Sequence, residues 1–261
     1  MAFSLARDAG FEGVELVVGP EVALRGAGYV RRLVQDYLPV LSVHPPILPY
    51  PSRNRPAAML PYLVSLAERV NCGLVVLHTP KVVHTEDPGW SDFVSALHGC
   101  RQKANPGVQI SLENSGFFRP CDSRYILHDL RKLRAFADHL GLPLTFDTAH
   151  AGTSPYELSE AYTLVQDRVV NIHFSDLVHR RIFPDWPPLY TLFRHHQKPG
   201  DGVLPLADFM RVALGSGYSG TFTVEVSPTA LRAWRPSQVR KALTALVGNI
   251  RQMEAEATIL P

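Results

Sequence analysis

The sequence predicts an α/β fold built on a parallel β-sheet, and three observations support this prediction. Seven short apolar runs alternate with longer segments in which apolar residues recur at helical spacing. Most of these runs end at or near a histidine or an acid. The chain has 261 residues, 46% hydrophobic and 19% charged, which is enough for one large α/β domain. Alternating strands and helices are typical of a parallel sheet buried on both faces.

The predicted strands are short and rich in β-branched residues. They cover residues 13–18, 40–44, 74–78, 108–113, 142–147, 169–174 and 221–226. Helices are predicted over residues 3–9, 22–38, 56–71, 89–104, 123–140, 155–166, 205–216 and 236–256. We expect Asp122 or Ser123 to cap the helix over 123–140 and Gly141 to end it. No linker-like stretch divides the series, so a single domain over residues 1–261 is predicted.

The stretch over residues 142–152 places two ionisable side chains at the end of a predicted strand. Asp147 follows the apolar residues Leu144 and Phe146, and His150 comes three residues later. One interpretation is a turn in which Asp147 accepts backbone N–H groups and His150 only packs. The other is a functional pair, because loops that follow strands carry function in α/β folds. This stretch alone leaves both interpretations open.

The other predicted strands also carry an acid or a histidine, in most cases at or near their ends. The full series is Glu15, His44, His78, Glu113, Asp147, His173 and Glu225. The intervals between its second and fifth members are 34, 35 and 34 residues, the length of one strand–helix unit. Since the carboxyl ends of the strands in a parallel barrel surround one mouth, we expect these side chains to converge. Buried charges are rare unless they are paired or bind a metal, so the series predicts a metal site.

Composition argues against several classes of protein. A net charge of +2 gives no general attraction to nucleic acid. No apolar run approaches the roughly 18 residues of a membrane span. Residues 1–8 do not resemble a signal peptide, so we expect a cytoplasmic protein without a membrane partner. Cys72, Cys100 and Cys121 are odd in number and share no close spacing, which argues against a disulfide framework or a zinc ribbon. Self-association into a homo-oligomer is left open.

Three polar or proline-rich segments follow predicted strands. The densest basic cluster is His179-Arg180-Arg181, which is either a solvated loop or a site for a phosphate or carboxylate. The proline-rich segments cover residues 45–51 and 183–188. Active-site loops of α/β folds lie at such positions.

Five motifs together resemble the xylose-isomerase-like TIM barrels. They are Leu112-Glu-Asn-Ser115, Phe146-Asp-Thr-Ala-His150, Asn171-Ile-His-Phe-Ser-Asp176, Pro199-Gly-Asp-Gly-Val-Leu-Pro-Leu206 and Val224-Glu-Val-Ser-Pro228. That superfamily contains sugar and sugar-phosphate isomerases and epimerases, and also apurinic endonucleases of the endonuclease IV type. The resemblance runs from Ala6 to about residue 250 and implies a TIM (β/α)8-type barrel.

The resemblance also implies a departure at the start of the chain. Family members begin with a strand before the first helix, and only a handful of residues precede that helix here. Either the true start lies upstream of Met1, or the barrel lacks its first strand. In the second case we expect seven strands, with a gap between residues 13–18 and 220–226 that leaves two unpaired edges.

The resemblance implies one divalent-metal site built from Glu113, Asp147, His173 and Glu225. Three carboxylates and one imidazole suit Mn²⁺, Mg²⁺ or Co²⁺ and tolerate Zn²⁺, and Mn²⁺ is the ion we expect. In the isomerases and epimerases the two glutamates face each other across the sugar, so we expect Glu113 and Glu225 to transfer the proton. Contacts to a sugar or sugar-phosphate substrate are expected from His44, His78, His150, Arg180, His195 and His196.

An endonuclease IV-like phosphodiesterase acting on abasic DNA is the alternative. This chain keeps counterparts of several histidine ligands of that branch: His44, His78, His150 and His195. That branch has an acid two residues before the equivalent of His195, where this chain has Phe193, and Pro199 is an additional residue. A three-zinc cluster is therefore not expected. A lyase, a dehydratase or a non-catalytic binding protein forms a third class, because one fold hosts many functions.

Overall fold

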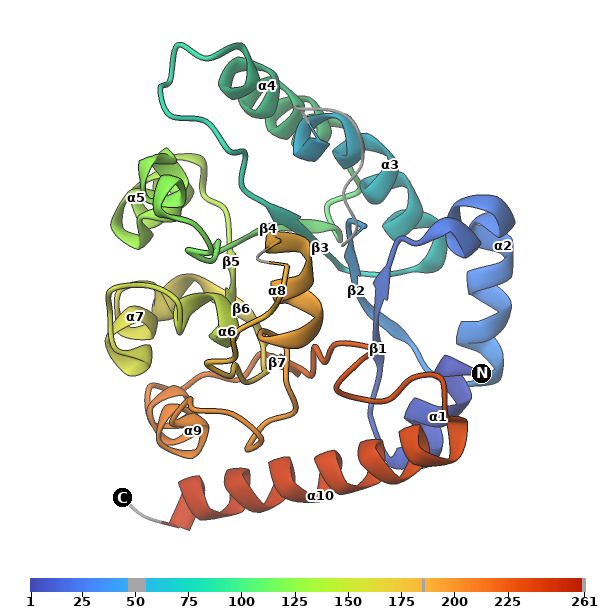
Figure 1. The fold of residues 1–261 in the computed structure, drawn as a ribbon. Coiled ribbons are helices and arrows are strands. Elements are labelled where there is room, and N and C mark those ends of the chain that lie inside the picture. The colour runs from blue at the N-terminus through green and yellow to red at the C-terminus, as the bar shows by residue number, and fades with distance from the viewer. Residues whose placement is uncertain (47–54, 185, 260–261) are drawn as a thin grey trace.

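The structure is a computed structural model that describes residues 1–46, 55–184 and 186–259 (Figure 1). Its centre is a sheet of seven parallel strands whose spatial order is their order in the chain. The strands are β1 (Val14–Val17), β2 (Val40–His44), β3 (Leu74–His78), β4 (Gln109–Glu113), β5 (Leu144–Asp147), β6 (Val169–His173) and β7 (Thr221–Thr223). The sheet curls into a nearly closed barrel surrounded by helices, which confirms the predicted TIM-type architecture.

The barrel is open between its first and last strands. Hydrogen-bonded ladders join each strand to the next, and none joins β7 back to β1 among the described strands. The predicted gap is therefore confirmed. The long helix α10 (Pro236–Ile259) runs outside this gap and packs against both α9 (Leu206–Gly215) and α1 (Ala2–Ala9) (Figure 1). Because strand edges offer unpaired backbone groups to other chains, a helix across the opening limits access to them.

The remaining helices connect successive strands and lie close to their predicted positions, with the exceptions given below. They are α2 (Pro20–Asp36), α3 (Arg55–Val70), α4 (Pro88–Lys103), α5 (Leu130–Leu140), α6 (Thr148–Ala151), α7 (Leu158–Thr163) and α8 (Pro187–Phe193), with the short 3₁₀ helices η1 (Pro120–Arg124), η2 (Ile126–His128) and η3 (Gln166–Arg168).

The helix predicted over residues 123–140 is wrong in its first part. This segment contains parts of η1 and η2, and α5 begins only at Leu130. Asp129 caps α5 by accepting two backbone N–H groups of the first turn at 2.9 and 3.0 Å. Neither Asp122 nor Ser123 is the cap of α5, because the Asp122 carboxylate already accepts two N–H groups of the preceding loop. Gly141 ends α5 in the left-handed conformation with φ 60°, as predicted.

The sequence analysis does not predict α6 and α8. Two prolines open α8, the position in a helix where proline costs least. This helix takes up the end of the second proline-rich segment, in which residue 185 lies outside the described residues. In the first proline-rich segment, residues 45 and 46 are described and residues 47–51 lie outside the described residues.

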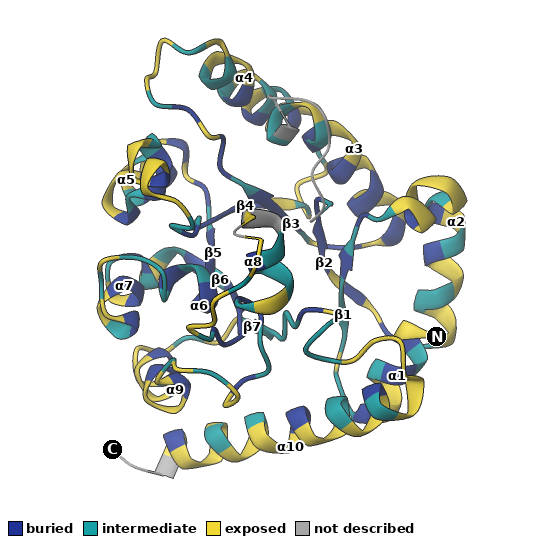
Figure 2. Ribbon diagram, in the orientation of Figure 1, coloured by how far each residue is buried: buried dark blue, intermediate teal, exposed yellow. Residues whose placement is uncertain are grey.

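The strands are largely buried, and so are the sides of the helices that face them (Figure 2). Apolar side chains form this core. An aromatic cluster joins Phe146 on β5 and Phe174 after β6 to Tyr162 on α7 and Phe209 on α9. The rings of Phe146 and Phe209 stack 5.6 Å apart, and Tyr162 meets both rings edge-on at 5.4 Å. All four side chains are at most 1% exposed. Such rings bury large apolar areas, so this cluster fixes β5 and β6 against the outer helices.

Across the described part of the chain, no helix has both the length and the apolar character needed to cross a membrane. All three cysteines are free; Cys72 and Cys100 are buried, and Cys121 is exposed.

Replacing Phe209 with alanine should lower the free energy of unfolding by about 3–5 kcal/mol, because the cavity left among three aromatic rings cannot collapse fully. Phe183→Ala is the matched control, since that ring is 97% exposed, and it should change stability by less than about 0.5 kcal/mol. The measurement is urea unfolding of both variants. Equal losses in the two variants would contradict this view of the core.

Candidate active site

The carboxyl ends of the strands bring the predicted residues to one mouth. His44, His78, Glu113, Asp147 and His173 are each the last residue of a strand, from β2 to β6. The pairing register sets His78 beside Glu113 and Asp147 beside His173. Glu225 follows β7 by two residues, because β7 is shorter than the predicted strand. The pairing register therefore places these side chains at the same height in the barrel, around one point at its mouth.

Four of these side chains form a compact cluster of Glu113, Asp147, His173 and Glu225. One ligand atom from each lies within 4.8 Å of the others. His173 Nδ1 is 3.0 Å from Glu225 Oε2, 3.4 Å from Glu113 Oε1 and 3.8 Å from Asp147 Oδ2. Glu225 is 15% exposed in its side chain, and the other three are buried. This is the set of residues that the resemblance implies for a metal site.

The hydrogen bonds of the cluster test whether these residues fit a metal. Asp147 Oδ2, His173 Nδ1 and Glu225 Oε2 are buried, and none has a hydrogen-bond partner among the described residues. A buried polar atom left unpaired costs free energy, and three such atoms beside one another need a common partner. A divalent cation accepts three oxygens and one nitrogen at such a point. The donor set therefore fits a divalent metal ion.

Asp147 serves the fold and the cluster with different oxygens. Its Oδ1 accepts the backbone N–H of His150 at 2.6 Å and caps α6. The side chain of Asn114 clasps the backbone of Asp147 from both sides, accepting its N–H at 2.7 Å and donating to its carbonyl at 3.1 Å. The turn considered in the sequence analysis is thus present, and it leaves Oδ2 directed at the cluster.

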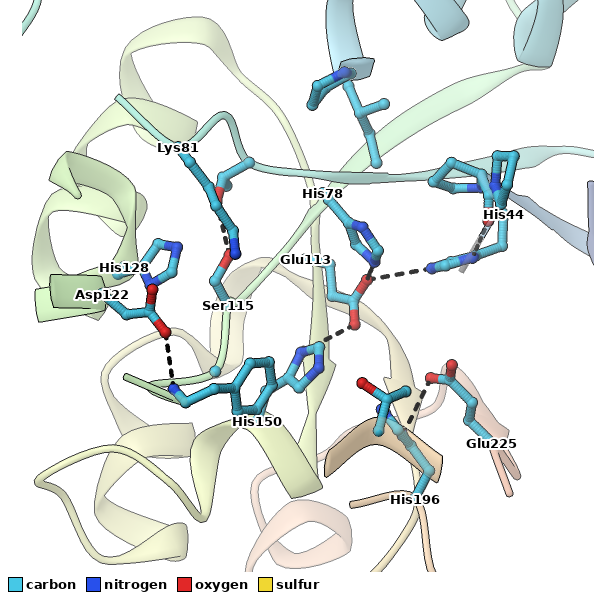
Figure 3. A pocket seen from close by; sticks show the side chains of 18 of the residues that line it. His44, His78, Lys81, Glu113, Ser115, Asp122, His128, His150, His196 and Glu225 are labelled. Atoms are coloured by element: carbon cyan, nitrogen blue, oxygen red, sulfur yellow. Dashed lines mark hydrogen bonds and ion pairs between the residues drawn. The ribbon is translucent and has the colours of Figure 1, made fainter. Parts of the chain in front are cut away.

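Three histidines, from β2, β3 and the turn after β5, surround Glu113 in Figure 3, and His173 on β6 is its fourth histidine neighbour. Its Oε2 lies 3.4 Å from His44 Nε2 and 3.0 Å from His78 Nε2, and its Oε1 lies 3.3 Å from His150 Nδ1. Burial raises the pKa of the Glu113 carboxyl, but the charges of His78 and His173 outweigh it and hold that pKa well below its ordinary value. Glu113 is therefore ionised and held by ion pairs.

The histidines respond in the opposite direction. Burial lowers the pKa of His150, yet Asp147 and Glu113 raise it to about 10. Burial likewise lowers the pKa of His44, while Glu113 and Glu15 raise it to about 9. Without a metal, protons on these imidazoles neutralise the buried carboxylates. Metal binding at a histidine requires that its nitrogen be free of the proton, so metal and protons compete for this cluster.

Three further groups in the same mouth have the composition of metal sites. They are Glu15, His44 and His173; His44, His78 and Glu113; and Asp147, His150 and His196. Each shares residues with the first cluster, so together they form one continuous field of ligand atoms.

The adjacent histidines His195 and His196 lie in different surroundings. His196 lines the central cavity, with Nδ1 3.8 Å from Asp147 Oδ2 and 3.7 Å from Glu225 Oε2. His195 is not among the described residues that line this cavity, and its ring stacks on Phe118 at 4.5 Å. Burial and the nearby charges of His150 and His196 lower the pKa of His195 to about 3, so it is neutral. Of the predicted pair, the structure brings only His196 to the cluster.

The cluster lies at one end of a cavity of about 600 Å³, within the range typical of small-molecule sites. His44, His78, Glu113, His150, His196 and Glu225 line it. Arg180 does not belong to its described lining. This arginine is exposed and lines a separate surface depression with Arg181 and Arg194. A substrate contact by Arg180 therefore stays an untested prediction, and the structure does not bring this residue to the cluster.

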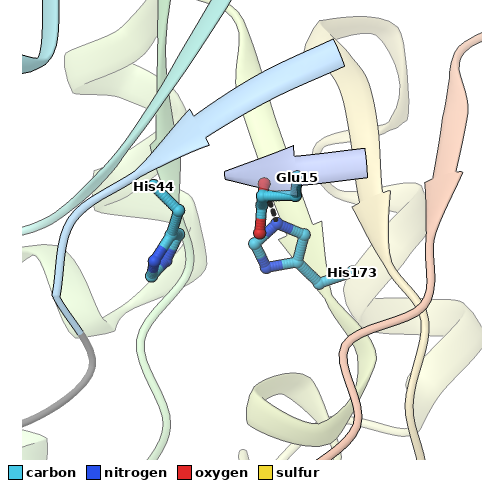
Figure 4. Close-up of side chains that lie close together, drawn as sticks. All are labelled: Glu15, His44 and His173. Atoms are coloured by element: carbon cyan, nitrogen blue, oxygen red, sulfur yellow. Dashed lines mark hydrogen bonds and ion pairs between the residues drawn. The ribbon is translucent and has the colours of Figure 1, made fainter. Parts of the chain in front are cut away.

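Glu15 is the functional neighbour whose role the sequence analysis missed (Figure 4). Its Oε2 lies 3.1 Å from His173 Nε2 and accepts the Ser42 hydroxyl at 2.6 Å. Because an ionised carboxylate only accepts, His173 Nε2 must carry the proton, and this leaves the Nδ1 lone pair for the cluster. Metal-binding histidines commonly donate their other N–H to a carboxylate in this way. The sequence signal was present, since Glu15 belongs to the series, but it stands inside its strand and not at the end.

We expect Glu15→Gln to weaken divalent-metal binding by about 10–100-fold, because the amide keeps the shape but loses the charge that orients His173. Competition with a chelating dye measures the affinity. The matched control is Glu12→Gln, whose side chain is 81% exposed and whose affinity should equal that of the wild type. Unchanged affinity in Glu15→Gln would refute the orienting role.

The metal-free protein should lose stability as the pH rises from about 6.5 to 10. Folding raises the pKa of His44 to about 9 and of His150 to about 10, above the ~6.5 of an unfolded histidine. The folded state therefore binds protons more tightly, and this stabilisation is complete below pH ~6.5 and is lost through the folded pKa values. Thermal unfolding of chelator-treated protein measures the effect. His150→Gln should flatten the profile and the exposed His139→Gln should not; identical profiles would count against these ion pairs.

Comparison with known proteins identifies relatives that match most of the chain. The model of the family described as "Xylose isomerase-like TIM barrel" matches residues 3–246. An uncharacterized protein of Mycobacterium tuberculosis is 29% identical over 89% of this chain and 85% of its own length. The fructoselysine 3-epimerase of Shigella flexneri is 23% identical over 86% of this chain and 84% of its own length.

Solved structures share the fold. A xylose isomerase domain protein from Planctomyces limnophilus matches with a TM-score of 0.73 and 17% identity, covering 98% of this chain and 93% of its own. A D-allulose 3-epimerase from Methylomonas sp. in complex with D-allulose matches with a TM-score of 0.68 and 16% identity, covering 95% and 88%. Since the family model spans nearly the whole length, this chain belongs to the xylose isomerase-like TIM barrel family.

Proposed function

We propose that this protein is a metal-dependent sugar isomerase or epimerase that moves a proton at a carbon beside a ketose carbonyl. One observation carries the proposal. Glu113 and Glu225 both line the cavity, and both belong to the cluster whose buried atoms lack hydrogen-bond partners. They come from β4 and from the segment after β7, with Asp147 and His173 between them in strand order. A proton-transfer reaction on a sugar needs two such carboxylates beside one substrate position.

The protonation of the two glutamates supports this role. Burial raises the pKa of Glu225, but the charges of His196 and His173 outweigh it and hold this pKa far below its ordinary value. Both carboxylates are thus ionised, which is the form that a proton acceptor requires. When bound, a divalent ion would polarise the substrate carbonyl and hydroxyl oxygens and so acidify the neighbouring C–H bond.

We assign removal of the carbon-bound proton, which gives a cis-enediolate, to one ionised glutamate. The other glutamate, after it has taken up a proton from solvent, delivers that proton to the enediolate, and the first glutamate then releases its proton to solvent. Return to the adjacent carbon gives an isomer, and return to the opposite face of the same carbon gives an epimer. His150 Nδ1 donates to the Asn114 carbonyl at 2.9 Å, so its Nε2 is the nitrogen left to bind a substrate hydroxyl. His196 lies on the same wall of the site, beside Glu225.

The relatives support a sugar substrate. Two of them carry names that state 3-epimerase activity, on fructoselysine and on D-allulose, and the second holds D-allulose in its structure. The donor set of three carboxylates and one imidazole favours Mn²⁺, with Mg²⁺, Co²⁺ and Zn²⁺ as alternatives.

The alternative is an endonuclease IV-like phosphodiesterase acting on abasic DNA. The observation that favours it is the set of overlapping ligand groups, in particular His44, His78 and Glu113 beside Asp147, His150 and His196. In this arrangement His196 takes the place that the sequence analysis gave to His195. The net charge of +2 provides little attraction for a DNA duplex, so the sugar enzyme is the better supported function.

Replacing Glu225 with glutamine should reduce turnover by ~10² or more, because the variant keeps an oxygen ligand and loses the base. Wild-type protein with Mn²⁺ should move deuterium from D₂O into a ketose, and product formation is followed in parallel because a shielded proton does not exchange. Glu86→Gln, an exposed control, should leave turnover unchanged. Absence of exchange and of product with all ketoses, together with chelator-sensitive nicking of an abasic duplex, would replace this function with the alternative.

A further inference from the structure

The far end of the central cavity has a different chemistry from the metal cluster. Lys81, Ser115, Arg119, Asp122 and His128 line it, and the two basic residues are exposed at its rim. Figure 3 shows Lys81, Ser115 and His128 on one side of the pocket and Glu113 and Glu225 on the other, with His150 between them. A ligand that fills the cavity therefore meets two distinct groups of side chains.

His128 is the observation that marks this end as a binding site. It is 2% exposed, and neither ring nitrogen has a hydrogen-bond partner among the described residues. Burial and the charge of Lys81 lower its pKa to about 4, so the ring is neutral and offers one N–H donor and one bare nitrogen. Native proteins rarely leave both nitrogens of a buried histidine unpaired. Since the ring lines the cavity, a bound ligand is the natural partner.

The surrounding loops are fixed in place. The Ile126 N–H donates to the Val82 carbonyl at 3.0 Å, which ties the segment that carries His128 to the loop that carries Lys81. Lys81 Nζ also lies 6.0 Å from the centre of the Tyr125 ring. Two loops that follow different strands thus hold their polar groups together before a ligand arrives.

Asp122 organises the loop that carries Arg119. Its Oδ2 accepts the N–H groups of Phe118 and Arg119 at 2.9 and 2.8 Å. Its Oδ1 is 3.4 Å from one terminal nitrogen of the Arg119 guanidinium. A guanidinium has five N–H donors, so Arg119 keeps most of them for another partner. At this end of the cavity Asp122 stands beside Lys81 and Arg119, whereas Glu113 and Glu225 line the other end (Figure 3).

We propose that the substrate carries an anionic group, a phosphate or a carboxylate, and that Lys81, Arg119 and His128 bind this group while the reacting carbons lie at the metal cluster. The proposal rests on the sugar isomerase or epimerase function proposed above. Arginine suits the paired oxygens of a phosphate or carboxylate, lysine adds a compact positive charge, and a neutral histidine adds a further N–H donor.

Direct binding tests the site independently of turnover. Inorganic phosphate and acetate are titrated into the metal-loaded wild type and into Lys81→Met/Arg119→Met, with heat of binding as the readout. The wild type should bind at least one of these anions about tenfold or more tightly than the double variant, the range expected for lost charge-assisted hydrogen bonds. Lys241→Met, on the distant helix α10, is the control and should bind as the wild type does. Equal binding by wild type and double variant would overturn the proposal.

Selectivity between substrates gives the second measurement. The ratio of kcat/KM for a ketose phosphate, or for a ketose with a carboxylate, to kcat/KM for the neutral ketose should exceed one in the wild type. It should fall about tenfold or more in Lys81→Met, and Lys81→Arg should restore most of it. The two anionic ketoses distinguish phosphate from carboxylate as the natural group. A ratio unchanged by Lys81→Met would overturn the proposal.

The variant His128→Phe separates binding from folding, because the new ring matches the aromatic neighbours Phe117 and Tyr125. We expect it to fold, and to lose anion affinity and anion selectivity. Greater stability with unchanged anion binding would show that His128 serves packing alone and would remove it from the site. If anion binding is lost in the double variant and no ketose reacts, the anion site stands and the proposed reaction fails.

Discussion

Three carboxylates buried around one histidine form the constraint on which this site depends. Glu113, Asp147 and Glu225 all approach His173 Nδ1 within 3.8 Å. Like charges at this spacing repel one another, and burial removes the water that would screen them. Protonated imidazoles supply the compensation in the metal-free protein, which explains the raised pKa values of His44 and His150. A divalent cation at the same point would supply the same compensation with a single charge centre.

The contacts that hold this cluster extend below the mouth of the barrel, and they connect strands on the two sides of its opening. Glu15 on β1 holds His173 on β6 from the layer beneath, with Ser42 on β2 as its second partner. The edge strand β1 is thus joined through the site to β6, the neighbour of the other edge strand β7. Outside the barrel, Arg251 on α10 donates to the Gly10 carbonyl at 2.9 Å and so ties α10 to the segment that leads into β1. These contacts hold β1 in place where a β7–β1 ladder would do so in a closed barrel.

The sequence predicted the strand ends well because two signals coincide there. Apolar runs define each strand, and regular 34- or 35-residue intervals align the polar residues that end them. It failed where geometry depends on three-dimensional neighbours. Nothing in the pair His195-His196 tells which ring enters the cavity, because a left-handed turn at His196 (φ 51°) decides it. The start of α5 was misplaced because Asp122 and Asp129 are equally good caps in sequence, and only the loop contacts of Asp122 distinguish them.

The two groups of side chains in the cavity come from different kinds of element. Groups that must be positioned closely, such as Glu113 and His173, end buried strands, whose ladders fix them in place. Lys81, Arg119 and His128 come from the segments that follow β3 and β4, where sequence changes cost the core little. If the proposed function holds, a change in these loops would alter which sugar binds and would leave the side chains at the strand ends in place. Reacting groups fixed at strand ends, with loops that can vary around them, are a general physical reason why one barrel fold supports many functions.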